Sequence, residues 1–128
     1  MAGVLVYNGG TEQRGPQNVN GGHTLMGEAK VLEIARRLGN AIVLPVMPYS
    51  SNNASNQQTG TLGLNAEIEA ALTERIVEQA ITTGFTTVIL LNDHGGSVKP
   101  MSAPERLAAA AVLPSRTSFS SLYGVIFT

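Results

Sequence analysis

Three short hydrophobic runs stand out along the first 98 residues of the chain, at positions 4–7, 41–44 and 87–91. Each run is rich in aliphatic residues and is closed by Gly, Asn or Pro, which is the pattern of a short buried strand. The apolar residues are continuous rather than alternating with polar ones, which indicates strands covered on both faces of a sheet. The pattern therefore predicts three buried strands.

The segments between these runs have the periodicity of amphipathic helices. The first, over about residues 23–38, has an apolar face made of Val31, Ile34, Ala35 and Leu38 and is followed by a Gly-Asn stop signal. The second begins after Asn65, a suitable N-cap residue, and ends at Gly84. Its apolar stripe is made of Ile68, Leu72, Ile76 and Ala80. We expect both stripes, with Val31 and Ile68 among them, to lie in the core.

The order strand–helix–strand–helix–strand favours a parallel sheet with right-handed crossovers. We predict an α/β fold of three layers, α/β/α, with a mostly parallel sheet that is incomplete. Residues 1–98 form the predicted domain. Residues 99–128 form a divergent tail, in which prolines flank an Ala-rich segment at 105–113 that could make a short helix.

Composition narrows the function classes. The chain has 128 residues, a net charge of −1, no Cys and no Trp, which excludes disulfides, thiolate zinc sites and a Cys nucleophile. There is no basic stripe to bind nucleic acid or an anionic membrane surface, and no apolar run approaches the roughly 18 residues of a membrane span. The first residues lack the charged start of a secretory signal. We expect a cytoplasmic location and leave open an export signal that has been removed.

Polar residues with ligand chemistry follow two of the predicted strands and begin one helix. Glu12 lies in the Gly-rich loop after the first strand, His94 follows the third strand, and His23 begins the first helix. Ligands of open parallel sheets collect at the carboxyl ends of the strands, so these three side chains are expected at one edge. A carboxylate and two imidazoles suit zinc or manganese and leave a coordination position open for hydrolytic chemistry.

Other interpretations of the same residues stay open. A Glu in a Gly-rich loop and a His at a helix start are each common as ordinary surface residues. The Gly-rich loop could instead cradle a phosphate at the helix start, as in a flavodoxin-like module. However, the chain has neither G-x-G-x-x-G nor G-x-x-x-x-G-K-[ST].

Four segments together resemble the motifs of the creatininase (creatinine amidohydrolase) family. Residues 11–16 (TEQRGP) resemble its E-Q-H-G-P-H signature, and residues 21–24 (GGHT) stand where the family has G-T-D. Residues 60–64 (GTLGL) resemble P-G-T-[IL]-[ST]-L, and residues 84–96 resemble G-F followed by N-G-H-G-G-N. The resemblance covers about residues 3–98. It implies a three-layer α/β/α fold, hydrolysis of a linear or cyclic amide C–N bond, and a homo-oligomer, because family members commonly assemble as hexamers.

The resemblance also implies a metal site, in which this chain departs from the family pattern. The ligand Glu and His of the first metal match Glu12 and His94, and His23 stands in place of the bridging Asp. Of the second-metal ligands, the His is replaced by Arg14 and the Glu by Gly96. We therefore expect one divalent ion, zinc or manganese, held by Glu12, His23 and His94.

Two further residues are candidates for a role in catalysis. The Arg14 guanidinium could hold a substrate carbonyl or carboxylate, and Asp93 could orient a ligand imidazole. Asp93 is equally compatible with a capping or loop residue.

The family resemblance leaves activity open. Family members are about twice as long, and nothing after Val98 resembles their second half. We expect a truncation or a changed reading frame. The alternative to an amidohydrolase acting on a small amide is an inactive family member that binds a metal or a partner.

Overall fold

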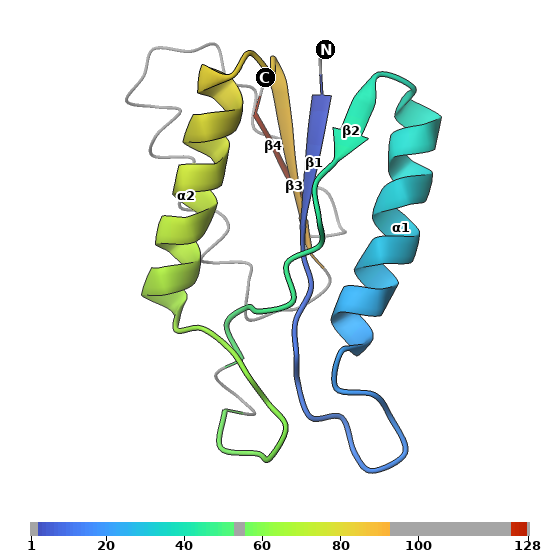
Figure 1. Ribbon diagram of the computed structural model, residues 1–128, viewed down its shortest axis with the longest axis vertical. Coiled ribbons are helices and arrows are strands. Elements are labelled where there is room, and N and C mark those ends of the chain that lie inside the picture. The colour runs from blue at the N-terminus through green and yellow to red at the C-terminus, as the bar shows by residue number, and fades with distance from the viewer. Residues whose placement is uncertain (1–2, 53–55, 93–123, 128) are drawn as a thin grey trace.

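The computed structural model describes residues 3–52, 56–92 and 124–127, and Figure 1 shows how their elements are arranged. Along the chain they are β1 (Gly3–Asn8), α1 (Gly22–Leu38), β2 (Ala41–Val43), α2 (Ala66–Thr82), β3 (Thr87–Asn92) and β4 (Gly124–Phe127). The three predicted strands and two predicted helices are thus present, with ends within one or two residues of the expected ones. The prediction that the strands are buried is correct for β1 but wrong for β2, whose three residues are only partly buried because it lies at one end of the strand order. The possible helix at 105–113 lies outside the described residues.

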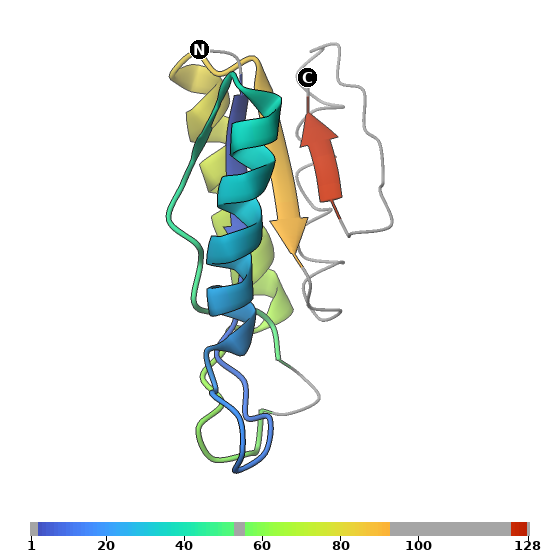
Figure 2. The same cartoon turned by 90° about the vertical axis from the view of Figure 1, so that its right-hand side faces the viewer.

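The four strands form one sheet in the order β2-β1-β3-β4. β1 is parallel to β2 and to β3, and β4 is antiparallel to β3. Helices α1 and α2 cover opposite faces, so the molecule has the predicted α/β/α layers and a mostly parallel sheet (Figures 1 and 2). Strand β4 was not predicted, because its short apolar segment follows a tail rich in Ser and Thr that lacks strand periodicity.

The two faces of β1 divide the core into two parts. Side chains alternate along a strand, so Val4 and Val6 point to one side and Leu5 and Tyr7 to the other. The first pair packs with residues of α2 and β3, namely Val77, Ala80, Val88 and Leu90. The second pair packs with Val31 and Ala35 of α1. All six residues of β1 are buried, which explains why the strand has a continuous apolar sequence.

Helix α1 agrees with its predicted apolar face except at the end. Val31 and Ala35 are buried, whereas Leu38 is 53% exposed. Gly27 also lies on the buried face, where a Cβ atom would come within 2.5 Å of the Tyr7 ring. The close approach of α1 to the sheet therefore depends on this glycine.

The predicted core stripe of α2 was wrong in its first half. Ile68 is 52% exposed and Leu72 36% exposed, and the side chains buried in their place are Glu69, Thr73, Val77 and Ala80. The Glu69 carboxylate accepts hydrogen bonds from Asn8 Nδ2 and from the Ser51 amide. These bonds fix the rotation of the helix, so its inward face begins one residue later than the apolar pattern indicates. Neither helix is long and apolar enough, over the described residues, to cross a bilayer.

The predicted N-cap of α2 is confirmed, because Asn65 Oδ1 accepts a hydrogen bond of 2.9 Å from the Ile68 amide. Replacing Asn65 with Ala should lower the free energy of unfolding by about 1 kcal/mol, since the amide loses its partner at the helix start. Urea unfolding of the purified chain measures this change. Asn65→Asp, which keeps the acceptor, is the control and should retain the stability. An equal loss in both variants would contradict the capping role.

Candidate metal centre

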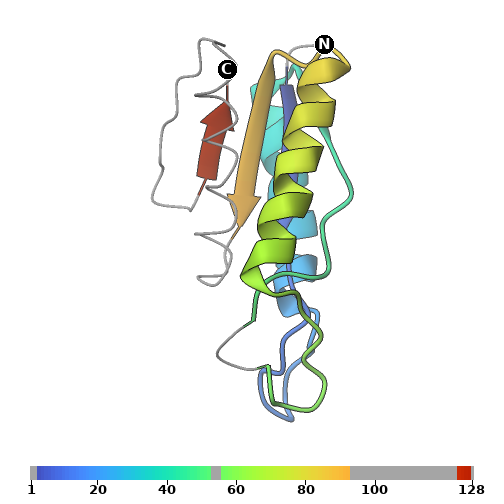
Figure 3. The ribbon, with the colours of Figure 1, turned by 90° about the vertical axis from the view of Figure 1, so that its left-hand side faces the viewer.

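The carboxyl ends of the parallel strands meet at one edge of the sheet, and both helices begin there (Figures 1 and 3). The loops that leave β1 and β2 run side by side and are joined through backbone hydrogen bonds. The Gly9 amide donates to Met47 O at 2.8 Å, and the Leu62 amide donates to Thr11 O at 3.0 Å. The loops at this edge therefore form a connected layer on which side chains can be held in fixed positions.

Glu12 and His23 come together at this edge, as the sequence predicts. Their Oε2 and Nε2 atoms lie 3.2 Å apart, and the side chains are 17% and 12% exposed, respectively. The Glu12 amide donates to Asn20 O at 2.8 Å, and the hydroxyl of Thr24 bonds to both the amide and the carbonyl of Gly10. Because His23 is the second residue of α1, these contacts place the loop carboxylate against the start of the helix.

Arg14 lies against the same helix start. A Cβ atom on Gly22, the first residue of α1, would be 2.7 Å from Arg14 Nη1, so the guanidinium lies directly against the start of the helix. The residue itself is exposed. A guanidinium and a helix N-terminus both attract negative charge. This part of the edge is therefore suited to a carboxylate or a polarised carbonyl oxygen.

The other two predicted site residues, Asp93 and His94, lie outside the described residues. The last described residue before them is Asn92, at the end of β3. It is 4% exposed and paired in register with Asn8 of β1. His94 thus follows two residues after a strand end that lies beside the end of β1. Within residues 3–52, 56–92 and 124–127, no three His, Cys, Asp or Glu side chains gather as a metal-binding group.

A layer of buried polar side chains lies beneath this edge, and sequence reasoning missed it. Its members are Asn8, Ser50, Ser51, Asn52, Glu69, Thr73 and Asn92. Glu69 is the charged member and is only 1% exposed. The sequence signal that could have found this layer was the polar residue at the end of two apolar strands, Asn8 and Asn92. Glu69 gave no such signal, because the helical periodicity assigned it to the outer face.

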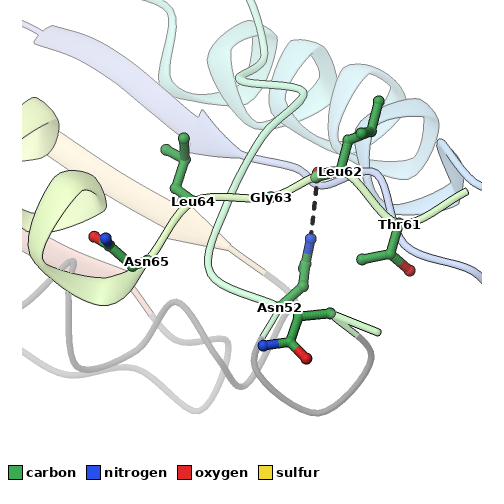
Figure 4. Close-up of a pocket in the computed structure, with 7 residues that line it drawn as sticks. Asn52, Thr61, Leu62, Gly63, Leu64 and Asn65 are labelled. Carbon is green, nitrogen blue, oxygen red and sulfur yellow. Dashed lines mark hydrogen bonds between the residues drawn. The ribbon is translucent and has the colours of Figure 1, made fainter. Parts of the chain in front are cut away.

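A polar groove of about 360 Å³ lies next to the Glu12 loop. Figure 4 shows its walls, made of Asn52, Asn56, Thr61, Leu62, Gly63, Leu64 and Asn65. Asn52 Nδ2 reaches the carbonyls of Thr11 and Leu62, and Thr61 Oγ1 accepts from the Gln13 amide at 2.9 Å. The groove wall is thus bonded to the residues on either side of Glu12.

These features define a class of protein: a three-layer α/β domain with a carboxylate–imidazole pair at the carboxyl edge of its parallel strands. The family model described as "Creatininase: Creatinine amidohydrolase" matches residues 1–121. The chain belongs to this family. The match extends past residue 98, the predicted end of the domain, and the division of the chain there stays a prediction.

Solved creatininase structures share the fold. A mutant creatininase complexed with creatine has a TM-score of 0.71 at 23% sequence identity, over 88% of this chain and 47% of that one. A structure described as "Creatininase Mn" has a TM-score of 0.69 at 22% identity, with coverage of 88% and 46%. A mutant creatininase of "Zn-Zn type" has a TM-score of 0.68 at 22% identity, with coverage of 88% and 46%. The chain spans less than half the length of these structures. A sequence search of curated proteins finds no match.

The Thr24 hydroxyl is expected to stabilise the Glu12 loop. Thr24→Val should lower the free energy of unfolding by about 1–2 kcal/mol, because it leaves the Gly10 amide and carbonyl without their side-chain partner in a partly buried place. It should also speed hydrogen exchange of the Gly10 amide. Thr24→Ser keeps the hydroxyl and serves as the control. Unchanged exchange at Gly10 in the Val variant would show that the loop is held by other contacts.

Proposed function

We propose that the chain carries the metal-binding part of a creatininase-family amidohydrolase, with Glu12, His23 and His94 as ligands of one divalent ion. The observation that carries the proposal is the 3.2 Å approach of Glu12 Oε2 to His23 Nε2 at the carboxyl edge of the sheet. These two side chains come from different elements, a loop and a helix start, and belong to two of the family-like motifs. His94 belongs to the motif that follows β3.

The donor set fits zinc or manganese. Both ions accept carboxylate oxygen and imidazole nitrogen, and both occur in the descriptions of solved creatininases. The two described donors are mostly buried but not sealed from solvent, so an ion and a substrate can reach them. The chemistry that such an ion supplies is activation of water and polarisation of an amide carbonyl.

The remaining roles fall to side chains around the pair. We infer that Arg14, next to the start of α1, binds a substrate carbonyl or carboxylate, and that Asp93 orients an imidazole. The groove along Thr61–Asn65 is the proposed place for the rest of a small linear or cyclic amide. A solved mutant creatininase with a similar fold is described as complexed with creatine, a small molecule. A homo-oligomer is also proposed, since β2 is a terminal strand of the sheet formed by the described residues.

Metal content is the direct test of the ligand set. The purified 128-residue chain should bind about one zinc or manganese ion, measured by elemental analysis and by titration calorimetry. His23→Ala and His94→Ala should each abolish tight binding, because each removes one of three protein ligands. Glu33→Gln, an exposed substitution on α1, is the control and should bind as the unaltered chain does. Two tightly held ions per chain would contradict the single-metal site.

Amide hydrolysis separates the two interpretations of the family membership. If the chain is an amidohydrolase, the metal-loaded protein should hydrolyse a small amide substrate such as creatinine. Arg14→Ala should then raise KM or lower kcat/KM by about 10-fold or more while leaving metal content unchanged, since the guanidinium is proposed to contact substrate only. Arg14→Lys tests the need for the planar guanidinium. Metal binding without hydrolysis would favour the alternative, a non-catalytic family member.

A further inference from the structure

One buried carboxylate connects three parts of the molecule near the candidate site. Glu69 lies in the first turn of α2 and is 1% exposed. Its Oε1 accepts a hydrogen bond of 2.9 Å from Asn8 Nδ2, at the end of β1. Its Oε2 accepts one of 2.7 Å from the Ser51 amide, in the loop after β2. The carboxylate thus holds a helix, a strand end and a loop in fixed relative positions.

Each of the two donors leads directly to residues of the site. Asn8 is followed by Gly9 and Gly10, which lead to Glu12, and Asn8 is paired in register with Asn92, two residues before His94. The Glu69 contact therefore lies where the chain carrying Glu12 and the chain carrying His94 leave the sheet together.

The Ser51 side of the contact leads to the groove. Ser51 forms a parallel bridge with Leu64, and the Leu64 amide donates to Ser50 O at 2.9 Å. The next residue is Asn52, whose side-chain Nδ2 donates to the backbone carbonyls of Thr11 and Leu62. One Glu69 oxygen is therefore hydrogen-bonded to the strand end beneath the proposed ligands, and the other is hydrogen-bonded to the loop that forms the groove wall.

The pattern of donors and acceptors allows little freedom at this position. Removing a hydrogen-bond donor destabilises a buried carboxylate much more than an exposed one, because water cannot take the place of the missing donor. Thr73 Oγ1 donates to the Glu69 carbonyl at 2.8 Å, which helps to fix the turn of helix that carries the carboxylate. Two N–H donors from different segments can both be satisfied only while those segments keep their spacing.

We propose that Glu69 is a positioning residue of the metal centre, setting the spacing between the Glu12–His23 pair and the strand end that leads to His94. This inference rests on the proposed function and extends it to a residue that carries no ligand atom.

The donor pattern suggests a polarity-swap experiment. Glu69→Gln places an amide NH2 opposite a donor, either Asn8 Nδ2 or the Ser51 amide, so one bond is lost. Asn8→Asp instead places two carboxyl groups side by side. In the double variant the new NH2 group at position 69 can donate to the new carboxylate at position 8, while the amide oxygen at position 69 still accepts from Ser51. The bonds then return with the Asn8–Glu69 polarity reversed and the side-chain sizes kept.

Zinc affinity of the 128-residue chain, measured by calorimetry, is the deciding quantity. We expect about a 10- to 100-fold loss in Glu69→Gln and in Asn8→Asp, the range typical when a group supporting metal ligands is removed, and recovery of most of it in the double variant. The Ser51 amide resonance should move in Glu69→Gln and return in the double variant, with or without zinc.

Two control variants separate positioning from simple stability. Val77→Ala creates a cavity on the same buried face of α2, so it should lower the unfolding midpoint and leave zinc affinity unchanged. Glu67→Gln removes an exposed charge from the same helix turn and should change neither quantity. If Glu69→Gln does not fold, Asn8→Ala, which removes only the donor to Oε1, is measured in its place.

Different results would overturn the positioning role of Glu69 and the proposed metal site. Failure of the unaltered chain to bind zinc or manganese overturns the proposed metal site itself. Normal metal binding by the unaltered chain, with unchanged affinity in Glu69→Gln or no recovery in the double variant, overturns only the positioning role. An affinity loss in Val77→Ala as large as that in Glu69→Gln would also overturn it, because stability alone would then account for the effect.

Discussion

The burial of β1 on every side is the constraint on which the other features depend. The strand is hydrogen-bonded to β2 and β3, and its two faces are covered by the two helix layers. A strand in this position has no face on which an unpaired polar side chain is stable. Polar chemistry is therefore confined to its ends. At the carboxyl end the chain changes within a few residues from the apolar core to Glu12, and the neighbouring β3 makes the same change on the way to His94.

The layer between core and site shows how competing energies set the rotation of α2. Burying Ile68 fully would gain about 1.5–3 kcal/mol, so leaving it half exposed forfeits roughly half of that gain. Residues 68 and 69 are separated by about 100° around the helix, and turning Ile68 inward would move Glu69 away from Asn8 and Ser51. Those two donors would then lie buried without acceptors, at a cost of about 1–3 kcal/mol each. The polar contacts outweigh the apolar stripe.

The sequence was sufficient to predict features that depend on local periodicity. The strands, the helices, the N-cap at Asn65 and the meeting of Glu12 with His23 follow from apolar runs, stop signals and the rule that parallel strands end at one edge. Features that depend on distant partners were not predictable in this way. The inward turn of Glu69 requires donors from β1 and from the loop after β2, and β4 requires an open edge on β3. Neither feature changes the local pattern of apolar and polar residues in its own segment.

The charged groups at the carboxyl ends of the parallel strands can be compared with the two-metal pattern that the family resemblance implies. Glu12 contributes one negative charge, Arg14 lies against the helix start with one positive charge, and the N-terminus of α1 adds positive potential. His23, standing where the family has a bridging carboxylate, would serve as a neutral ligand. In the proposed single-metal site, each of these differences would lower the attraction for a second dication while leaving donors for the first. The positive potential near Arg14 and the helix start would stabilise negative charge that develops on the carbonyl oxygen of the proposed amide substrate. In that proposal, the fixed charge of Arg14 would supply part of the electrostatic stabilisation that a second ion would otherwise supply.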